Sequence, residues 1–490
     1  MKKGYFELNK LQKCWKNALF LLCFVTYFNL CFSQCITEVW GGARHCIALR
    51  SDSTVWTWGA PGALGDGTNL ERDVPVEVHG PNNIGFLDSV IHVMSGELFC
   101  FALKANGTVW SWGANIASGF TGTLGDGTTV SSRNNAVRVA GLDSVIALGG
   151  RGYHSLAIRG DSSVWGWGSN LGGAFPPGGG QLGMDTSVSH GSNVAIKIKG
   201  LGAARQVTGG GFFSLVLLSN HTIMAFGNNY FGELGVGDTA SRHSPSLVAG
   251  LTNVAMVSGG WQHSVALKSD GTVWTWGKNL EGQLGTGDTI NRNTPTQVAG
   301  LNGIISVSGG DYSTLALKSD GTVWAWGGNE RGECGDGTKI TRKRPVRVAA
   351  LTNIIYIAAR DYHNVAIKSD GTLWSWGWDL NGQCGNGSTK DTVWTPMQIS
   401  GLGCMTTGLA TPRSSLDIVV YPNPSPAVIT IENLKQGTVL ISNLQGQQLK
   451  VPVVGSAKNS FDFSGFPGGI YFIKMKTENE LVTKKVIIQK

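Results

Sequence analysis

Histidine is well suited to acid–base or metal chemistry near neutral pH, and it recurs at one position of a repeated pattern in this chain. Four repeats begin an H-x-x-A-L-like stretch with it, at His45, His154, His263 and His363. The other three repeats place a side chain there that cannot act as a base: Phe99, Phe213 and Ser313. We therefore interpret the histidines as structural residues at strand ends, hydrogen-bonded to a turn. We predict no catalytic residue and no metal ligand.

Aspartates in a G-D-G pattern are the second candidates for chemistry. Asp66, Asp126 and Asp336 occupy this position and resemble residues of calcium loops. The D-x-[DN]-x-[DN]-G spacing of a calcium loop is missing, whereas aspartate commonly stabilises turns. Glycine pairs such as Gly259-Gly260 also lack the spacing of phosphate-binding loops. We predict that these residues form turns and that the protein needs no cofactor.

The net charge suggests nucleic acid, but its distribution does not. The chain carries a formal charge of +7, whereas residues 34–410 carry a net charge of −1. The excess lies in residues 1–33 and 411–490. One local basic cluster, "TRKRPVR" at 341–347, is interpreted as the solvated edge of a repeat. Because nucleic-acid binding needs a basic surface, we expect no nucleic-acid partner.

The elements that must position these side chains recur about every fifty residues. Each repeat contains the H-x-x-A-L-like stretch, then W-x-W-G, then L-G-x-G or a variant of it. The seven W-x-W-G positions are Trp56/Trp58, Trp110/Trp112, Trp165/Trp167, Met224/Phe226, Trp274/Trp276, Trp324/Trp326 and Trp374/Trp376. A fixed period of this length is typical of a repeat architecture.

A single unit predicts the architecture. "VAMVSGG", "HSVALKSDG", "TVWTWG" and "PTQVAG" are short runs rich in β-forming residues, separated by turn residues. Asp270-Gly271 predicts a tight hairpin between the second and third runs. Both indoles of "VWTWG" fall on one face of a strand, and the other face carries Val273 and the small Thr275. Units with one bulky and one small face suit stacking. We predict an all-β, seven-bladed β-propeller over 34–404 and disfavour an open solenoid, because no capping segments appear.

These motifs resemble the regulator of chromosome condensation repeat family, over roughly 35–402. The resemblance implies a seven-bladed propeller. Some members of that family are nucleotide-exchange factors for a small nuclear GTPase, a role that an exported chain would not share. At least one secreted bacterial member inhibits β-lactamases, which keeps inhibition of a secreted enzyme as an alternative function.

The first 33 residues read as a secretory signal peptide. A lysine-rich start precedes the apolar stretch "ALFLLCFVTYFNLCF" (18–32), which is too short for a typical membrane span. Cleavage after Ser33 would leave Gln34 as the first residue. A lipoprotein attached through Cys35 is a weaker alternative, because Phe32-Ser33-Gln34 is a poor lipobox. We expect export to the periplasm and no later membrane span.

The tail departs from the repeat. After a linker at 405–415, residues 416–490 alternate apolar residues with turn signals and predict a small β-sandwich of six or seven strands. "YPNP" (421–424), "LQGQQL", "GGIYFIK" and "KKVIIQ" resemble the C-terminal sorting domain of type IX secretion substrates. The resemblance implies recognition by the secretion machinery and a protein that is secreted or displayed on the outer cell surface. The matching residues include Tyr421, Pro422, Asn423, Pro424, Lys484 and Lys485.

Two long connections are the candidate binding loops. The step from the glycine of W-x-W-G to the next L-G-x-G is seven residues in the last four repeats, eleven in the second and fourteen in the third. The insertions, 114–123 and 169–181, carry Phe120 and Phe175 among Gly, Ser and Pro. Apolar anchors on adaptable loops are typical of binding surfaces, although neutral insertions would look the same.

The predicted function is therefore binding, not catalysis. We expect one propeller face to bind an extracellular protein or glycan. A propeller enzyme that acts on polysaccharide is the alternative. It would need paired carboxylates or a His–Tyr set at one end of the channel, and no single repeat carries its own acidic cluster.

Two cysteines are predicted to close the ring. Counting within the repeats puts Cys35 and Cys404 at the same position, that of Asn253, at the two ends of the propeller. An exported protein can form a disulfide there. The pair Cys46 and Cys100, like the pair Cys334 and Cys384, occupies equivalent positions one repeat apart. Equivalent Cα atoms of neighbouring blades are too distant to bridge, so we expect core thiols there.

Overall fold

The structure is a computed structural model of the chain. It describes residues 35–117, 120–172, 178–187, 189–387 and 392–402, and in the tail 419–421, 428–432, 438–443, 448–449, 458–463, 469–476 and 481–488. Contacts divide the chain into two units, Met1–Thr406 and Thr407–Lys490. The predicted signal peptide and the linker at 405–415 lie outside the described residues.

The first unit contains seven four-stranded antiparallel sheets, which we call blades 1 to 7, with strands A to D in chain order from the innermost strand outward. Blades 1 to 4 consist of β1 (Ile36–Gly41), β2 (His45–Arg50), β3 (Val55–Gly59) and β4 (Arg72–Glu77); β5 (Val90–Ser95), β6 (Phe99–Lys104), β7 (Val109–Ala114) and β10 (Ser132–Arg138); β11 (Val145–Arg151), β12 (His154–Arg159), β13 (Val164–Ser169) and β14 (Gly191–Lys197); β15 (Ala204–Gly209), β16 (Phe213–Leu218), β17 (Ile223–Gly227) and β18 (Arg242–Leu247).

Blades 5 to 7 repeat the same plan. They consist of β19 (Val254–Gly259), β20 (His263–Lys268), β21 (Val273–Gly277) and β22 (Arg292–Gln297); β23 (Ile304–Gly309), β24 (Ser313–Lys318), β25 (Val323–Gly327) and β26 (Arg342–Arg347); β27 (Ile354–Arg360), β28 (His363–Lys368), β29 (Leu373–Trp378) and β30 (Thr392–Gln398). The short helix η1 (Pro81–Asn83) and the two-stranded ribbon of β8 (Ile116–Ala117) and β9 (Phe120–Thr121) lie in connections between strands.

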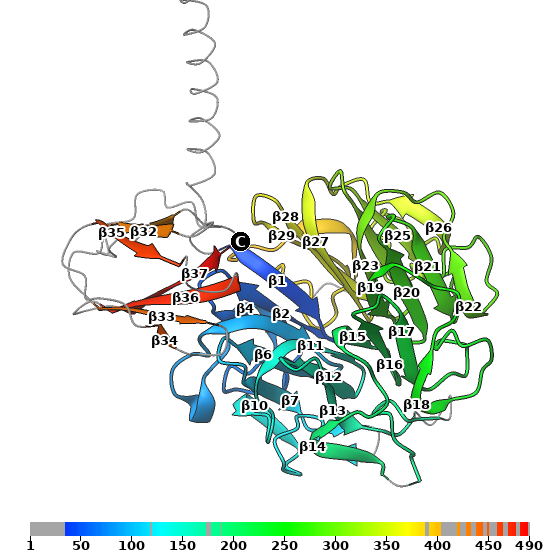
Figure 1. The fold of residues 1–490 in the computed structure, drawn as a ribbon. Coiled ribbons are helices and arrows are strands. Elements are labelled where there is room, and N and C mark those ends of the chain that lie inside the picture. The colour runs from blue at the N-terminus through cyan, green and yellow to red at the C-terminus, as the bar shows by residue number, and fades with distance from the viewer. Residues whose placement is uncertain are drawn as a thin grey trace, which may run out of the picture. The chain divides into compact units, whose positions relative to one another are not determined.

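The seven blades form a closed ring (Figure 1). Each strand A lies beside the strands A of the two neighbouring blades, and β1 of blade 1 contacts β27 and β28 of blade 7. The predicted seven-bladed propeller is therefore confirmed, and an open solenoid is excluded. Every blade is one continuous stretch of chain, so the two ends of the propeller do not share a blade.

The second tryptophan of W-x-W-G joins each blade to the one before it. Trp276 is 0% exposed, and its Nε1 donates a hydrogen bond to the carbonyl oxygen of Glu233 at 2.9 Å. A Cβ atom on Gly235, in the preceding L-G-x-G, would lie 2.6 Å from the indole nitrogen, so only glycine fits there. The ring closes with the same contacts, because Trp58 Nε1 donates to Gln383 at 2.9 Å and packs on Gly385. The two motifs thus recur together because each completes the other across a blade boundary.

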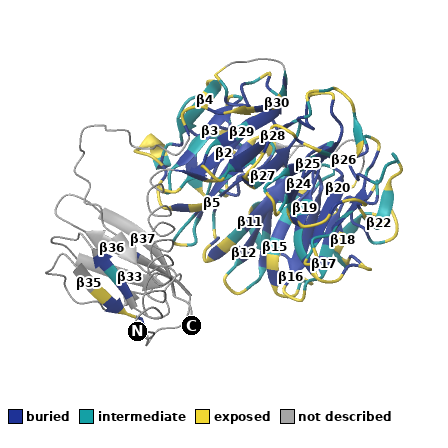
Figure 2. Cartoon of the chain, turned by 90° about the horizontal axis from the view of Figure 1, so that it is seen from above, coloured by how far each residue is buried: buried dark blue, intermediate teal, exposed yellow. Residues whose placement is uncertain are grey.

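The predicted Asp-Gly hairpin is also present. Leu267 pairs with Val273, and the turn between them places Gly271 at φ 79°. The Oδ1 of Asp270 accepts hydrogen bonds from the backbone and the hydroxyl of Thr272, at 3.0 and 2.6 Å. Figure 2 shows that buried residues follow the strands and exposed residues the connections, as a stack of sheets requires.

The second unit contains two small sheets. One has the order β31 (Val419–Tyr421), β32 (Val428–Glu432), β35 (Lys458–Asp462), and the other β34 (Gln448–Leu449), β33 (Thr438–Asn443), β36 (Gly469–Lys476), β37 (Leu481–Ile488). Ile429, Ile431, Phe461, Phe463 and Ile473 are buried. The tail is thus rich in strands, while its predicted sandwich packing stays a prediction. Among the described residues of the chain, no helix has the length and apolar character of a membrane span.

Candidate functional site

Two kinds of connection between strands lie at one end of the propeller. Because the four strands of a blade are antiparallel, the turn between strands A and B and the loop between strands C and D lie at the same end. In blade 5 these connections are residues 260–262 and 278–291. We call this end the loop face. The A–B turns surround the axis, and the C–D loops lie farther out.

Two of the seven A–B turns carry a buried arginine. Strands β11 and β27 are one residue longer than the other strands A and end at Arg151 and Arg360. The other five blades have glycine at this position: Gly42, Gly96, Gly210, Gly260 and Gly310. Both arginines are 3% exposed. The departure from the repeat therefore puts two guanidinium groups at the inner edge of the loop face.

Arg151 reaches across the centre of the ring. From blade 3 it donates to the Oδ1 of Asp311 at 2.5 Å, to the carbonyl oxygen of Gly259 at 3.1 Å and to that of Gly309. These acceptors belong to blades 5 and 6. Arg360, from blade 7, packs against Gly41 of blade 1. Among the described residues, the Nη2 of Arg360 and the Nε of Arg151 have no hydrogen-bond acceptor.

Three carboxyl groups face the two arginines: Glu97, Asp311 and Asp361. Although burial opposes ionisation, the charge of Arg151 lowers the pKa of Asp311. Burial and the charge of Asp311 raise the pKa of Asp361 well above its usual range, which favours its uncharged form, and Asp361 hydrogen-bonds Asp311. Burial and the charge of Asp311 also raise the pKa of Glu97 to about 7. We call these five residues the charge cluster.

Aromatic rings surround the charge cluster. Tyr153, Phe212 and Trp261, from the turns of blades 3 to 5, pack together with ring centroids 5.4 to 6.1 Å apart. Tyr312 stacks on Tyr362 at 5.2 Å, with an angle of 26° between the rings. Trp378, at the end of β29, meets Tyr362 edge-on at 5.7 Å. We call these six residues the aromatic rim, and the rim and the charge cluster together the channel mouth.

Basic side chains from the loop face lie over the rim. The Nζ of Lys278 is 5.5 Å from the ring centre of Tyr312 and donates to the Oε1 of Gln262 at 2.9 Å. Arg44 and Arg331 lie over Trp378 at 5.6 and 5.5 Å. Such cation–π contacts are favourable and hold the rings in place. The mouth is therefore both aromatic and charged.

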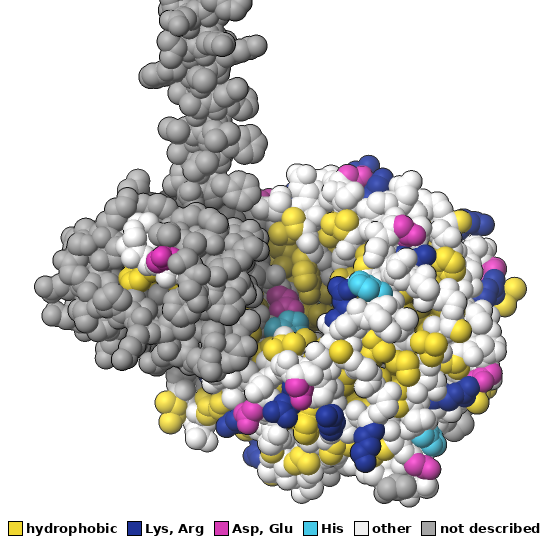
Figure 3. Space-filling view, viewed as in Figure 1, with side chains coloured by type: hydrophobic (Ala, Val, Ile, Leu, Met, Phe, Trp, Pro, Cys, Tyr) yellow, Lys and Arg dark blue, Asp and Glu magenta, His cyan; other side chains and the backbone are white. Residues whose placement is uncertain are grey.

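The centre of the ring holds a further ion pair between strands β1 and β5. His92 Nδ1 lies 2.7 Å from Glu38 Oε1. Although burial opposes protonation, the charge of Glu38 raises the pKa of His92. Figure 3 shows acidic and histidine side chains gathered in a hollow among the blades. The centre of the ring thus carries an ion pair in addition to the charge cluster.

A family model described as an RCC1-like domain matches residues 25–303 and 179–411, well over half of the chain. The chain belongs to the RCC1-like family. A second model, described as a secretion system C-terminal sorting domain, matches residues 419–489 and confirms the type IX sorting tail. The chain therefore combines an RCC1-like propeller with a secretion sorting domain.

Known relatives of the RCC1-like propeller share the fold over parts of longer proteins. It is 37% identical over 215 residues to the probable E3 ubiquitin-protein ligase HERC6 of Homo sapiens, covering 42% of this chain and 20% of that protein. It is 30% identical over 220 residues to the ultraviolet-B receptor UVR8 of Arabidopsis thaliana, covering 44% of this chain and 47% of the receptor. The chain thus spans less than half the length of either relative.

Two solved structures have the same fold. Prp20p of Saccharomyces cerevisiae, whose reported structure concerns binding to Gsp1p and histones, superposes with a TM-score of 0.62 at 20% identity, covering 81% of this chain and 90% of that one. Human WBSCR16 superposes with a TM-score of 0.60 at 22% identity, covering 71% and 94%. At these identities the likeness establishes the fold alone.

The predicted binding loops of the RCC1-like propeller lie on its loop face. The blade 2 insertion forms the ribbon of β8 and β9, and β9 contacts β13 of blade 3. In the blade 3 insertion Leu171 pairs with Gly179. The side chain of Phe120 and all of Phe175 lie outside the described residues. Their role in binding stays a prediction.

The repeated histidines are structural, but their partner is not a turn. His263 Nε2 lies 2.9 Å from the hydroxyl of Thr314, a strand residue of the next blade, which itself donates to the carbonyl of Gln283. His263 therefore donates from Nε2. Burial lowers the pKa of His45, His154, His263 and His363 to about 3. The hydrogen bonds cross the blade boundary because the strand ends face the neighbouring blade.

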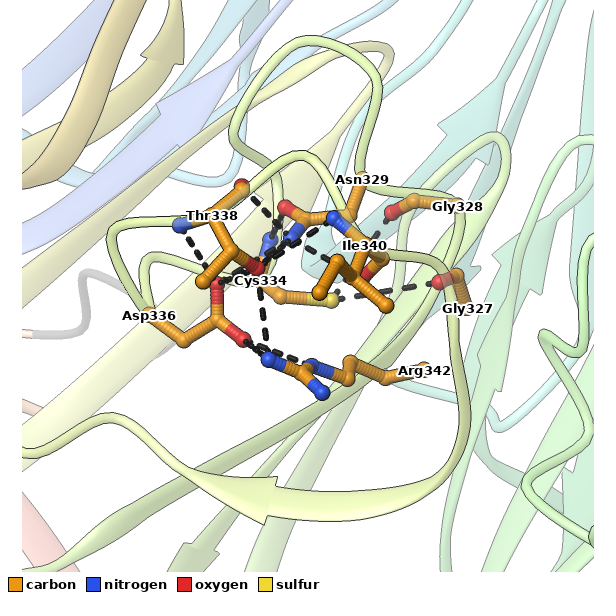
Figure 4. A network of polar contacts seen from close by, with 8 residues as sticks. All are labelled: Gly327, Gly328, Asn329, Cys334, Asp336, Thr338, Ile340 and Arg342. Atoms are coloured by element: carbon orange, nitrogen blue, oxygen red, sulfur yellow. Dashed lines mark hydrogen bonds and ion pairs between the residues drawn. The ribbon is translucent and has the colours of Figure 1, made fainter.

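The G-D-G aspartates form turns, as predicted. In blade 6 the Oδ1 of Asp336 accepts from the backbone of Thr338 at 3.0 Å, and its Oδ2 accepts from Arg342 Nε at 2.6 Å (Figure 4). Asn329 joins the same network and accepts from the backbone of Cys334 at 2.8 Å. Asp66 and Asp126 bind a threonine and an arginine in the same way. These networks fix the C–D loops of the loop face.

The predicted core thiols are confirmed. Cys46, Cys100, Cys334 and Cys384 are buried and free. Cys35 is buried beside β1 and is not one of the free thiols. Cys404 lies outside the described residues, so its pairing with Cys35 stays a prediction.

The sorting residues that the structure describes lie in strands. Tyr421 ends β31, and Lys484 and Lys485 lie in β37, where they pair with Ile473 and Phe472 of β36. The three residues that follow Tyr421, Pro422, Asn423 and Pro424, lie outside the described residues.

The channel mouth was not predicted from the sequence. The sequence predicts no acidic cluster within a single repeat. The carboxyl groups come instead from three blades, with Glu97 in blade 2, Asp311 in blade 6 and Asp361 in blade 7. One signal was available: "RGYH" at 151–154 and "RDYH" at 360–363 place arginine where every other repeat has glycine.

Proposed function

We propose that the protein is a secreted or cell-surface binding protein that uses the loop face of its propeller to bind an extracellular protein or glycan. The channel mouth carries this proposal. There the chain departs from its own repeat and gathers buried charge and aromatic rings that blade stacking does not need. Perturbed carboxyl groups among convergent polar and aromatic side chains are typical of binding sites.

The two long loops extend the same face. Loops 114–123 and 169–181 are C–D connections, like the ones that meet the aromatic rim in blades 5 and 6. We infer that they form one continuous surface with the mouth and that Phe120 and Phe175 are apolar anchors on it. Two sites on one face would let a large partner bind centrally and peripherally at once.

The sorting tail supports export. A type IX sorting domain implies recognition by the secretion machinery, and passage through the periplasm requires the predicted signal peptide at 1–33. We infer that the tail is read by that machinery and that the propeller reaches the medium or the outer cell surface. A chain that lacks 416–490 should fold and stay in the periplasm. Cell fractionation with an antibody against the propeller measures this, and truncated protein in the medium would refute the export role.

A Cys35–Cys404 disulfide fits an exported ring of this kind. The blades at the two chain ends are not interlocked, so a covalent link between those ends would hold the ring closed. We infer that these two cysteines are paired in the secreted protein. Non-reducing peptide mapping decides the matter, and finding both cysteines alkylatable in the native protein would refute the pairing.

A polysaccharide-degrading enzyme is the second candidate, because the mouth does hold paired carboxyl groups. Glycoside hydrolysis, however, uses two carboxyl groups about 5 Å or more apart, with sugar between them. Asp361 and Asp311 instead hydrogen-bond each other, and Asp311 is also paired with Arg151. This geometry favours binding over hydrolysis.

The experiment is to immobilise the full-length secreted protein and expose it to a panel of glycans and secreted enzymes. Saturable binding without product release supports the proposal. Turnover of any glycan, measured as new reducing ends, would establish the enzyme. Inhibition of a secreted enzyme on binding would define the protein as an inhibitor, which is a special case of binding.

A further inference from the structure

The charge cluster has hydrogen-bond donors without acceptors. Arg360 and Arg151 are each 3% exposed, yet the Nη2 of one and the Nε of the other have no partner among the described residues. An unsatisfied buried donor is costly, and a charged one more so. Because both side chains end at the channel mouth, an acceptor that enters from the loop face can satisfy them.

The cluster also has more positive than negative charge near neutral pH. Arg151 is paired with Asp311, while burial and neighbouring carboxyl groups raise the pKa of Asp361 well above its usual range and that of Glu97 to about 7, which favours their uncharged forms. The groups that act on Glu97 are Asp311, Arg360, Arg151 and Arg44. Arg360 therefore lacks a fully charged partner. On the rim, Lys278 lies near Glu281, while Arg44 and Arg331 add further positive charge beside the cluster.

A carboxylate is the anion that fits this excess. The guanidinium group presents planar pairs of N–H donors, which match the two oxygens of a carboxylate. Here two arginines from blades 3 and 7 converge, and each keeps a buried donor that has no acceptor among the described residues.

The rest of the mouth suits a ligand rich in hydroxyl groups. The hydroxyls of Tyr312 and Tyr362 hydrogen-bond each other, and burial raises the pKa of Tyr153 to about 12, so these phenols stay protonated. Each can both donate and accept. The half-buried ring of Trp261 lies beside them. Many two-way hydrogen-bonding groups next to aromatic surface match a sugar better than a single acidic side chain.

We propose that the channel mouth binds a carboxylate-bearing saccharide, of the uronic acid class, with the carboxylate on Arg360 and Arg151 and the sugar ring against the aromatic rim. This rests on the proposed binding function and names the ligand chemistry of the same face. Acidic peptides and neutral sugars are the outcomes that the test must separate from it.

The first test uses the full-length protein and calorimetric titration with trigalacturonic acid, a neutral galactose trisaccharide and an acidic peptide. The uronate should bind and the other two should not. Raising the pH from about 6 to about 8 ionises Glu97 and should weaken uronate binding about tenfold, since the new charge repels the ligand carboxylate. Failure of the uronate to bind, or equal binding of the neutral sugar or the peptide, would overturn the proposal.

Two variants and a control locate the site. Glu97→Gln mimics the protonated group and should keep near pH 8 the affinity that the parent has near pH 6. Arg360→Lys keeps the charge but loses the paired donors, and should weaken binding about tenfold. Arg347→Gln, on the exposed outermost strand β26, should bind like the parent. An unchanged pH dependence in Glu97→Gln would overturn the proposal even if Arg360→Lys does not fold.

These outcomes are distinct from those that test the proposed function. If another glycan or a protein is captured while uronates fail, the binding function stands and the ligand assignment is wrong. If nothing in the panel is bound, both are wrong.

Discussion

Trp276 and Trp261 lie fifteen positions apart in blade 5, yet the two regions they belong to follow opposite rules. Trp276 sits in the interface between blades, where six repeats place a tryptophan, and blade 4 places Phe226, against the glycine of L-G-x-G. Trp261 sits at the channel mouth, where the corresponding residues are small or acidic: Ala43, Glu97, Gly152, Gly211, Asp311 and Asp361. A ring closes only when the interfaces between its blades are alike, whereas ring closure does not constrain the residues of the channel mouth. We therefore infer that residues that vary among the repeats serve function and that residues that stay the same serve stability.

Replacing each of the two tryptophans in turn tests this difference most directly. Trp276→Ala should lower the free energy of unfolding by about 3–5 kcal/mol, because it leaves a large cavity in the core and removes one of the two hydrogen bonds that the carbonyl of Glu233 accepts. Trp261→Ala should cost less than half of that, since its ring is only half buried. Urea denaturation of both variants measures the difference. Equal losses would mean that the mouth is as structural as the interfaces.

The closing interface is expected to differ from the other six by its covalent link. Cys404→Ser should lower the free energy of unfolding by about 2–4 kcal/mol, because it frees the two chain ends in the unfolded state. Thermal melts with and without a reductant measure this. Cys334→Ser, a change of a free core thiol, is the control and should respond equally to both conditions. A parent melt that is insensitive to reductant would contradict the link.

The buried histidines should make the interfaces sensitive to acid. His263 has a pKa of about 3 in the folded protein and about 6.5 when unfolded, so only the unfolded state gains a proton between these values. Stability is therefore lost as the pH falls from about 6.5 toward 3. His263→Phe, which copies blades 2 and 4, should cost about 1 kcal/mol near pH 7 for the lost hydrogen bond but flatten the loss in acid.

Acid titration followed by tryptophan fluorescence measures this effect. His243→Phe, at an exposed position on β18, is the control and should leave the profile unchanged. Comparison with the parent separates His263 from Glu233 and Glu333, whose pKa burial raises to about 7. A variant as acid-sensitive as the parent would show that His263 does not set the profile.

The smallest effect on stability is expected from the two long loops. Shortening 114–123 and 169–181 to the seven-residue step of the other blades should change the melting temperature little, because closure entropy varies slowly with loop length. Binding of the partner should fall sharply. Shortened protein that still captures its partner would remove the loops from the proposed surface and leave the channel mouth alone.

The sequence predicts the ring because the partners in each interface are visible as motifs. W-x-W-G and L-G-x-G recur in order, and Trp276 meets Gly235 of the blade before it. The turns at Asp270 and Asp336 follow from local chemistry that involves residues two to six positions away.

The charge cluster was not predictable in the same way. Its members are spread from Glu97 to Asp361, and each one alone resembles a tolerated exception in a turn. The raised pKa of Asp361 depends on burial and on its closeness to Asp311, which only the closed ring sets. The two R-x-Y-H sequences could have indicated the cluster, because they are positions at which two repeats depart from the other five.

The ring closes between Trp58 and Gly385 with the same contacts that Trp276, Trp326 and Trp376 make at their boundaries, and no blade is shared between the two ends of the propeller. The fold therefore does not require the chain to begin at blade 1. A circular permutant that starts at blade 4 and joins residue 402 to residue 35 through a short linker should build the same ring. It would bring Arg151 and Arg360 to the same mouth in reversed chain order.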